Sequence, residues 1–232
     1  MSTRRLIVAI DGPAGAGKST VARHLAQHFG LLNLETGAMY RAFALKALKN
    51  NVAPGDLEAL DQLSSETTIA LQPTPEGNRV LLDSVDVTSQ LRDAEVTQAA
   101  SQVSVHPPIR AWMVHLQREM GRAGGVVMEG RDIGTVVFPD ADLKFFLDAS
   151  PEARSQRRYE QAGPSPATPV NPEAIARELR ERDERDRNRA ESPLRPAPDA
   201  IVIDSTSLTL DQVLSQIEAI VTEKLAPPEL PR

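Results

Sequence analysis

Cysteine is absent from this chain of 232 residues. That absence excludes disulfide bonds, thiolate zinc sites and cysteine nucleophiles, and it fits a reducing compartment. Long apolar runs are missing too, since no segment approaches the roughly 20 apolar residues that a membrane span needs. The formal net charge is −6, and no basic tail offsets it. We therefore expect a cytoplasmic protein that has no membrane partner and no nucleic-acid partner.

A secretory signal is not expected either. Arg4 and Arg5 precede an apolar run, but this run covers only residues 6–10 and ends at Asp11. The apolar region of a signal peptide needs roughly 7–15 residues. The run is better explained as the first strand of a folded domain.

Lysine is scarce, whereas arginine is abundant. The chain has 5 lysines and 21 arginines, and ten of the arginines lie between Arg154 and Arg195. The planar guanidinium group matches the oxygens of carboxylates and phosphates. In an acidic protein, such a block indicates a site that holds an anion.

The chain contains the phosphate-binding pattern G-x-x-x-x-G-K-[ST] near its start. Its residues are Gly12, Pro13, Ala14, Gly15, Ala16, Gly17, Lys18 and Ser19. The apolar run at 6–10 predicts a buried parallel strand before it. Apolar residues at helical spacing predict a helix over 19–29, which Gly30 ends. The alternative is a chance glycine-rich turn, and this strand–loop–helix context argues against it.

This loop suits a triphosphate for physical reasons. Glycines let successive backbone N–H groups approach an anion closely, and the following helix directs its positive end there. Lys18 would reach the β- and γ-phosphates, and the Ser19 hydroxyl would bind Mg²⁺. We predict that a nucleoside triphosphate binds along Gly12 to Thr20.

The rest of the chain alternates strands with helices, which predicts a parallel sheet covered on both faces. Further strands are expected at 31–35, 126–129, 143–147 and 201–204, and further helices at 38–48, 56–63, 94–105, 109–120, 151–161, 172–190 and 209–225. Short strands at 68–71, 79–83 and 85–87 have the turn spacing of antiparallel hairpins. The predicted fold class is α/β, a P-loop fold with a five-stranded parallel sheet and a small antiparallel subdomain inserted at 64–103. The core would then comprise 1–63 and 104–226, with a flexible tail at 227–232.

Charged residues follow the third strand of this predicted sheet. Ligand sites in such folds lie beyond the carboxyl ends of the strands, here in the loops 11–19, 35–41, 129–135 and 148–151. Glu129 is expected in the outer shell of Mg²⁺. Arg131 and Asp132 come directly afterwards and suit phosphate chemistry. The alternative for these two is a local ion pair, which is common in loops and contributes little.

The helix at 172–190 changes character along its inward stripe. Ile175 and Leu179 begin the stripe, and the same spacing continues through Arg182, Asp186 and Arg189. A bound anion would explain why the two arginines lie on that face. The alternative is a solvent-exposed helix stabilised by i,i+4 ion pairs, and the pairs Glu181–Arg185 and Asp183–Arg187 would satisfy it.

The helix before the proline-rich loop at 162–172 also carries arginines, namely Arg154, Arg157 and Arg158. Two arginine-bearing helices joined by such a loop predict a lid at about 154–190. Its closure would bring positive charge over a transferring phosphoryl group and exclude water.

Five stretches carry a resemblance to a known family. They are 11–19 (DGPAGAGKS), 36–41 (TGAMYR), 99–104 (AASQVS), 130–139 (GRDIGTVVFP) and 182–189 (RDERDRNR). The chain resembles the bacterial cytidylate kinases, P-loop nucleoside monophosphate kinases that phosphorylate CMP and dCMP from ATP. The likeness covers nearly the whole chain and includes the inserted subdomain. The proline-rich lid tip at 162–169 departs from the family's pattern.

The resemblance implies roles for particular residues. The α-phosphate of CMP would be held by Arg41, Arg131 and Arg189, and Thr36 would support this monophosphate site. The cytosine edge would be read by Ser101, Arg110 and Asp132. The ribose would be faced by Arg182 and Asp186. Catalysis would depend on Lys18, Arg131, Arg182 and Arg189. ATP would contact the P-loop with Arg157 and Arg158, and Mg²⁺ would lie near Ser19 and Glu129. Asp132 can accept a hydrogen bond from the cytosine amino group, whereas uracil offers a carbonyl oxygen there and would be rejected.

Three rival functions remain at this stage. The nearest is another small-molecule kinase of the same fold, acting on UMP, AMP or a small alcohol. A P-loop GTPase would need a guanine-reading Asn-Lys-x-Asp motif, which the chain lacks. A non-catalytic nucleotide-binding regulator would bind ATP without acceptor-dependent release of ADP. We expect a monomer with small-molecule partners.

Overall fold

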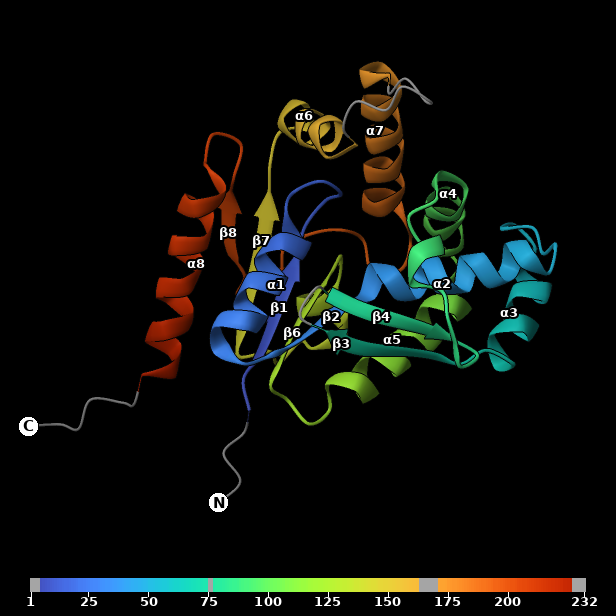
Figure 1. Ribbon diagram of the computed structural model, residues 1–232, viewed down its shortest axis with the longest axis horizontal. Coiled ribbons are helices and arrows are strands. Elements are labelled where there is room, and N and C mark those ends of the chain that lie inside the picture. The colour runs from blue at the N-terminus through green and yellow to red at the C-terminus, as the bar shows by residue number, and fades with distance from the viewer. Residues whose placement is uncertain (1–4, 75–76, 163–170, 227–232) are drawn as a thin grey trace, which may run out of the picture.

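The computed structural model describes residues 5–74, 77–162 and 171–226 (Figure 1). The predicted tail at 227–232 and nearly all of the proline-rich lid tip lie outside these residues. No helix in the described part of the chain is both long and apolar enough to cross a membrane.

A five-stranded parallel sheet forms the centre of the molecule, as predicted. Its order is β2-β6-β1-β7-β8. The strands are β1 (Ile7–Asp11), β2 (Leu32–Glu35), β6 (Val126–Gly130), β7 (Leu143–Asp148) and β8 (Ile201–Asp204). The chain adds strands first on one side of β1 and then on the other. Ligands of open α/β sheets bind at such a reversal, beyond the carboxyl ends of the strands.

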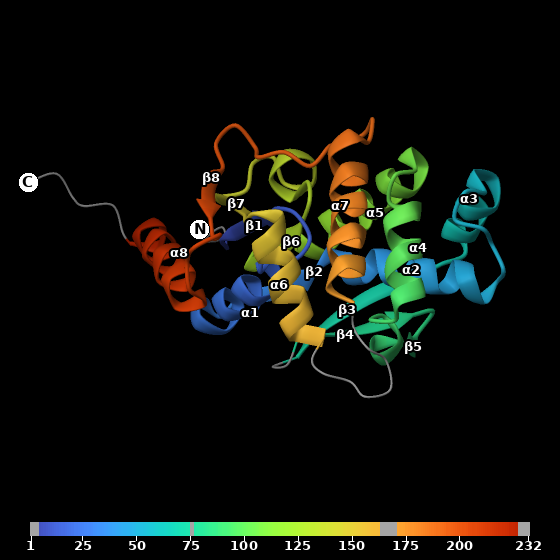
Figure 2. The same ribbon diagram turned by 90° about the horizontal axis from the view of Figure 1, so that it is seen from above.

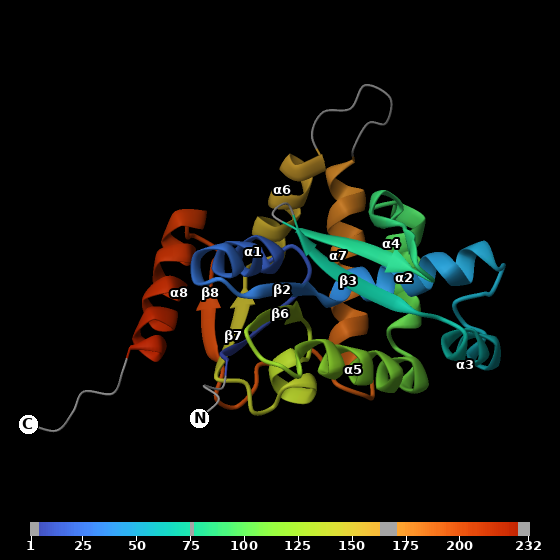
Figure 3. The same ribbon diagram turned by 60° about the horizontal axis from the view of Figure 1, so that its bottom comes forward.

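Helices cover both faces of this sheet because its strands alternate their side chains. Val8 and Ile10 of β1 pack on one face with α1 (Lys18–Phe29) and α8 (Leu210–Leu225). Ile7 and Ala9 face the other side, where α5 (Pro107–Gly121) and the π-helical turn η2 (Ile133–Val137) pack. Figure 3 shows α5 and α1 on opposite sides of the strands. Strands β1, β6 and β7 are buried nearly throughout, and strands buried on both faces need the continuous apolar runs that predicted them.

The inserted segment forms a second, antiparallel sheet. It contains β3 (Ile69–Thr74), β4 (Gly77–Leu82) and β5 (Val85–Asp86), followed by η1 (Thr88–Gln90) and α4 (Ala94–Val103). The three strands confirm the hairpin prediction. Helix α4 ends at Val103 instead of Val105, and Ser104 and Val105 form a turn before His106 and Pro107.

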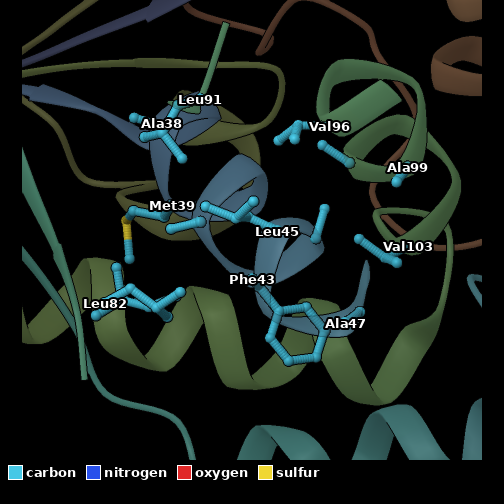
Figure 4. Close-up of a cluster of buried hydrophobic side chains, with 14 of the residues drawn as sticks. Ala38, Met39, Phe43, Leu45, Ala47, Leu82, Leu91, Val96, Ala99 and Val103 are labelled. Atoms are coloured by element: carbon cyan, nitrogen blue, oxygen red, sulfur yellow. The ribbon is translucent and has the colours of Figure 1, made fainter. Parts of the chain in front are cut away.

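The core of this insert includes residues from outside 64–103. Helices α2 (Thr36–Lys49) and α3 (Leu57–Ser65) contribute buried side chains to the same cluster as β4 and α4. Figure 4 shows Met39, Phe43 and Leu45 of α2 in one cluster with Leu82 and Val96. Burying one such side chain fully contributes about 1.5–3 kcal/mol. Helix α2 is therefore part of the same hydrophobic core as the insert.

Two helices stand above the carboxyl ends of the central strands. They are α6 (Pro151–Ala162) and α7 (Pro172–Asn188). Ser150 accepts a hydrogen bond from the Ala153 amide, and Asn171 accepts one from the Glu173 amide, so both helices begin at the predicted caps. In Figure 2, α7 lies between α6 and α4. The polar stripe of α7 is thus placed between the insert and the phosphate loop.

Candidate active site

The phosphate loop joins β1 to α1 in a backbone conformation that needs glycine. Gly12, Gly15 and Gly17 have φ values of 146°, 78° and 98°, in the region that side chains disfavour. A Cβ atom on Gly12 would lie 2.0 Å from the carbonyl oxygen of Leu147. The first fixed glycine of the pattern is therefore required by the close approach of β7. Helix α1 begins at Lys18 and directs its N-terminus into the loop.

Lys18 is buried beneath this loop. Its ammonium group donates a hydrogen bond to the Pro13 carbonyl oxygen at 2.7 Å. Burial, together with the charge of Arg131, lowers the pKa of Lys18 to about 7. A cation that is so poorly solvated gains strongly from an anionic partner.

Ser19, Glu129 and Thr36 meet where β6 and β2 end. The Ser19 hydroxyl donates to Glu129 Oε1 at 3.1 Å, and the Thr36 hydroxyl donates to the Glu129 carbonyl oxygen at 2.8 Å. Hydroxyl and carboxylate oxygens are the ligands that Mg²⁺ prefers, usually with waters and substrate phosphates completing its shell. These donors fit the predicted magnesium position, and Thr36 fixes the strand end that carries Glu129.

Asp11 organises the turn after β6, a role that the sequence reading missed. Its two carboxylate oxygens accept hydrogen bonds from the backbone amides of Ile133 and Gly134, each at 2.8 Å. Burial raises the pKa of Asp11 to about 7, although both hydrogen bonds oppose that shift. The bonds tie η2 to the end of β1. They thereby place the preceding Arg131 and Asp132 at the mouth of the sheet.

Three arginines and two aspartates form a buried network beside the loop. Arg131 Nε donates to Asp186 Oδ2 at 2.8 Å, and Arg110 pairs with Asp132. Arg189 lies between them, with nitrogens 3.8 Å from Asp186 Oδ1 and 3.9 Å from Asp132 Oδ1. The structure therefore brings together five residues that the resemblance assigned to the CMP site. The local ion pair considered for Arg131 with Asp132 is not the arrangement observed, since each has another partner.

Positive charge exceeds negative charge at the edge of this network. The Nε atoms of Arg41 and Arg182 are buried and have no hydrogen-bond partner in the described residues. Burial, together with the charge of Arg131, lowers the pKa of Arg182 to about 10. Burial opposes ionisation of Asp186, but the charges of Arg131, Arg182 and Arg189 still hold its pKa below the ordinary value. Buried cations without full partners indicate a place for a bound anion.

The stripe of α7 is buried as predicted, with one addition. Leu179 and Asp186 are buried, Ile175 and Arg182 are half-buried, and Asp183 is buried as well. The helix ends at Asn188 and not at the predicted residue 190, so the buried Arg189 lies just beyond it as an extended C-cap residue. Asp183 accepts from Arg154 of α6 at 2.6 Å. The alternative of an exposed helix with an Asp183–Arg187 pair is therefore wrong.

Arg154 has structural partners on three sides. It donates to the carbonyl oxygens of Ala149 at 2.9 Å and Ala14 at 3.0 Å, besides its pair with Asp183. Only 2% of this residue is exposed. Arg154, predicted to be one of the arginines of a closing lid, instead connects α6 to the phosphate loop and to α7.

The other lid arginines differ from one another. Arg157 donates to the side chain of Ser205 at 3.0 Å and to its carbonyl oxygen at 2.5 Å, at the end of β8. Arg158 is exposed. Both lie on α6, but in this conformation neither contacts the phosphate loop through a hydrogen bond or ion pair recorded for the described residues. Their role toward ATP remains a prediction.

Two contacts near the insert were not predicted. Arg185 Nε donates to the Ser101 hydroxyl at 3.1 Å, which joins α7 to α4. The Arg110 guanidinium lies over the Tyr40 ring, 6.0 Å from its centroid. Burial raises the pKa of Tyr40 to about 12. No local spacing links these pairs, because their members lie on different elements.

Two cavities flank the network. One of about 790 Å³ lies among the ends of β7 and β8 and helices α6 and α7, with Arg154 and Asp183 in its wall. The other, of about 360 Å³, lies between α2 and the β3–β4 hairpin. Its wall holds four arginines, Arg23, Arg41, Arg79 and Arg92. Arg41 is the predicted site residue that lines this smaller, cation-rich cavity.

Comparison with known proteins shows what the whole chain is similar to. The family described as cytidylate kinase matches residues 8–223. A cytidylate kinase from Solibacter usitatus is 47% identical over 223 residues, covering 96% of this chain and 94% of that protein. One from Pelotomaculum thermopropionicum is 49% identical over 216 residues, covering 93% of this chain and 95% of that protein.

A solved structure shares the fold at low identity. An uncharacterised protein from Eubacterium ventriosum aligns with a TM-score of 0.51 and 14% identity, covering 94% of this chain and 99% of that chain. At this identity the likeness concerns the fold alone. The family match and the two relatives confirm the resemblance found in the motifs, and the chain belongs to the cytidylate kinase family.

Proposed function

We propose that this protein transfers the γ-phosphoryl group of ATP to CMP and dCMP, giving CDP or dCDP and ADP. The observation that carries the proposal is the buried arginine network beside the phosphate loop. It joins Arg131 and Arg189 to Asp186, with Arg182 left short of partners. A monophosphate held there would lie next to the phosphates on the loop.

The residues of the site would act mainly by positioning and by stabilising charge. Lys18 would contact the β- and γ-phosphates of ATP, and Arg131 and Arg189, with Arg41, would hold the α-phosphate of CMP. An oxygen of that phosphate would attack the γ-phosphorus in line, and the ADP oxygen would leave. No covalent intermediate on the protein and no strong base is needed, because the charge spread over the phosphoryl group is what requires stabilisation.

Mg²⁺ bound with ATP would neutralise part of the phosphate charge. Ser19 and Glu129 would hold the Mg²⁺, directly or through water, because their side-chain oxygens lie next to each other. Helices α6 and α7 would exclude water from the reaction, since a kinase that admits water hydrolyses its donor.

Base recognition would fall to the pair of Arg110 and Asp132. Arg110 holds Asp132 in place, and the second oxygen of Asp132 lies 3.9 Å from a nitrogen of Arg189. That oxygen would accept from the cytosine amino group. Uracil would bring a carbonyl oxygen to the carboxylate, which is unfavourable. Ser101 would complete the base site, and Arg182 with Asp186 would face the ribose.

An acceptor panel tests the proposal directly. ADP release is measured with ATP and Mg²⁺ against CMP, dCMP, UMP, AMP and no acceptor. We expect rapid turnover with CMP and dCMP and little with UMP. Turnover with UMP or AMP instead would overturn the assignment of Asp132 but keep a kinase. Binding of ATP without acceptor-dependent release would overturn the enzyme itself.

The variant Arg131→Ala tests the network. We expect kcat/KM for CMP to fall by about 10²–10³, the usual loss when a charge-stabilising donor is removed. The matched control is Arg177→Ala, an exposed arginine on α7. Circular dichroism and thermal unfolding check that both variants fold. Wild-type turnover in folded Arg131→Ala would contradict the proposed role.

We also propose that the protein works as a monomer in the cytoplasm, with nucleotides as partners and no nucleic acid. The lack of cysteine and the net charge of −6 support this setting. Analytical ultracentrifugation of the free and nucleotide-bound protein would measure the oligomeric state.

A further inference from the structure

Two histidines and a glutamate meet on the outer surface, where α1 packs against α8. His24 and His28 are one helical turn apart on α1, and their rings lie 5.9 Å apart between centroids. His24 Nε2 contacts Glu218 Oε1 of α8, and His28 Nδ1 lies 3.4 Å from the same oxygen. One donor atom from each residue lies within 4.8 Å of the others. Within the described residues, this is the one group of three His, Cys, Asp or Glu side chains so spaced.

The backbones that carry these residues are held by the core beneath them. Val21 and Leu25 of α1, and Ile217 and Val221 of α8, are all buried in one cluster. These four residues are neighbours of the three polar ones along the two helices. The spacing of the donors is therefore set by packing, and a ligand would not have to bring two free helices together.

The chemistry of the donors selects a class of ion. Two imidazole nitrogens and one carboxylate oxygen suit Zn²⁺ and the neighbouring divalent transition metals, whereas Mg²⁺ prefers oxygen alone. Donor atoms in a tetrahedral zinc site lie roughly 3.3 Å apart, given metal–ligand bonds of 2.0–2.1 Å. Small side-chain rotations reach this spacing from the one observed. Glu218 supplies the carboxylate oxygen that lies nearest to both imidazole rings.

We propose that His24, His28 and Glu218 form a binding site for a divalent transition metal ion such as Zn²⁺, with water completing the shell. The side chains are 35%, 51% and 28% exposed, so an ion can enter from solvent. His24 lies six residues beyond Lys18, about 9 Å along α1 at the helical rise. The site is thus separate from the phosphate loop. Its ion would join the helix that begins at that loop to the last helix of the fold.

Zinc binding to the chelator-treated, nucleotide-free protein tests the inference. Isothermal titration is done with excess Mg²⁺ present, which keeps zinc from the oxygen donors near Ser19. We expect one tight site per chain and a rise in melting temperature with zinc. Cobalt, as a spectroscopic probe, should give the absorption of a tetrahedral site with nitrogen ligands.

Single substitutions locate the site. His24→Gln, His28→Gln and Glu218→Gln should each weaken zinc binding by more than the roughly 10- to 100-fold that loss of a mere supporting contact costs. The matched control is His115→Gln, an exposed histidine on α5, which should bind zinc like the wild type. ADP release by all four variants should match the wild type without zinc, and this shows that they are folded.

Several outcomes would overturn the inference. They are absence of tight binding in the wild type, unchanged binding in His24→Gln or His28→Gln, and loss of binding in His115→Gln. Because the readout is binding and not turnover, these outcomes are independent of whether CMP is the acceptor.

Discussion

At the scale of single residues, the main feature of the site is that its charged side chains are largely shielded from solvent. Lys18 has its pKa lowered to about 7 by burial and by the charge of Arg131. Near neutral pH, a part of the free protein therefore lacks the charge that triphosphate binding needs. Bound phosphates would favour the ammonium form and restore its pKa.

Proton uptake on ATP binding follows from this shift. Above pH 7 the free protein has lost much of the Lys18 proton, and the complex regains it. We expect uptake approaching about one proton near pH 8, and ATP affinity that falls as the pH rises further. Calorimetry in two buffers of different ionisation enthalpy measures it. Lys18→Met should abolish the uptake, and absence of uptake in the wild type would contradict the lowered pKa.

At the scale of elements, α7 separates two kinds of charge. Asp183 faces α6 and is satisfied by Arg154, which also binds the loop carbonyl of Ala14. One turn further, Asp186 faces the arginines of the proposed CMP site. Neighbouring positions of the same helix therefore differ in role: Asp183 makes a structural contact, and Asp186 faces the proposed substrate site.

Loss of Arg154 should destabilise the fold. Arg154→Met leaves Asp183 and two carbonyl oxygens buried without their partner, and we expect unfolding to become about 3–5 kcal/mol easier. Urea denaturation measures this free energy. Arg180→Met, an exposed change on α7, should stay within about 0.5 kcal/mol of the wild type. Adding Asp183→Leu to Arg154→Met should recover part of the loss. An unchanged stability of Arg154→Met would refute the structural role.

At the scale of the whole molecule, the arrangement favours function over the stability of the free protein. Arg182 is half-buried beside Arg131, and its buried Nε lacks a hydrogen-bond partner in the described residues. Such a group costs stability until a ligand arrives. The buried network of Arg110, Asp132, Asp186 and Arg189 limits this cost by alternating the charges next to it.

Arg182→Met should therefore separate stability from activity. The methionine keeps most of the buried stem without the charge, and we expect the free energy of unfolding to rise by about 1 kcal/mol. Turnover with CMP should fall at least about 100-fold. Urea denaturation and ADP release are measured on the same preparation. A destabilisation as large as that of Arg154→Met would show that Arg182 is a structural ion-pair member.

The sequence by itself determined the phosphate loop, the order of strands and helices, the antiparallel insert and the family. Each of these depends on residues close together in the chain: the fixed glycines before Lys18, apolar runs, and caps such as Asn171. The stripe of α7 was also predictable, because helical periodicity places Arg182 and Asp186 on the face of Leu179.

Only the tertiary structure decided which charges pair. Asp183 forms an ion pair with Arg154 of α6 and not with Arg187 of its own helix, because α6 packs against the side of α7 that carries Asp183. Arg185 reaches Ser101, and His28 reaches Glu218, in the same way. A pair four residues apart is available to an isolated helix, whereas these pairs exist only after elements distant in the chain have packed. Once these side chains are buried, leaving a charge without a partner costs free energy, so each charge pairs with the group that packing places beside it.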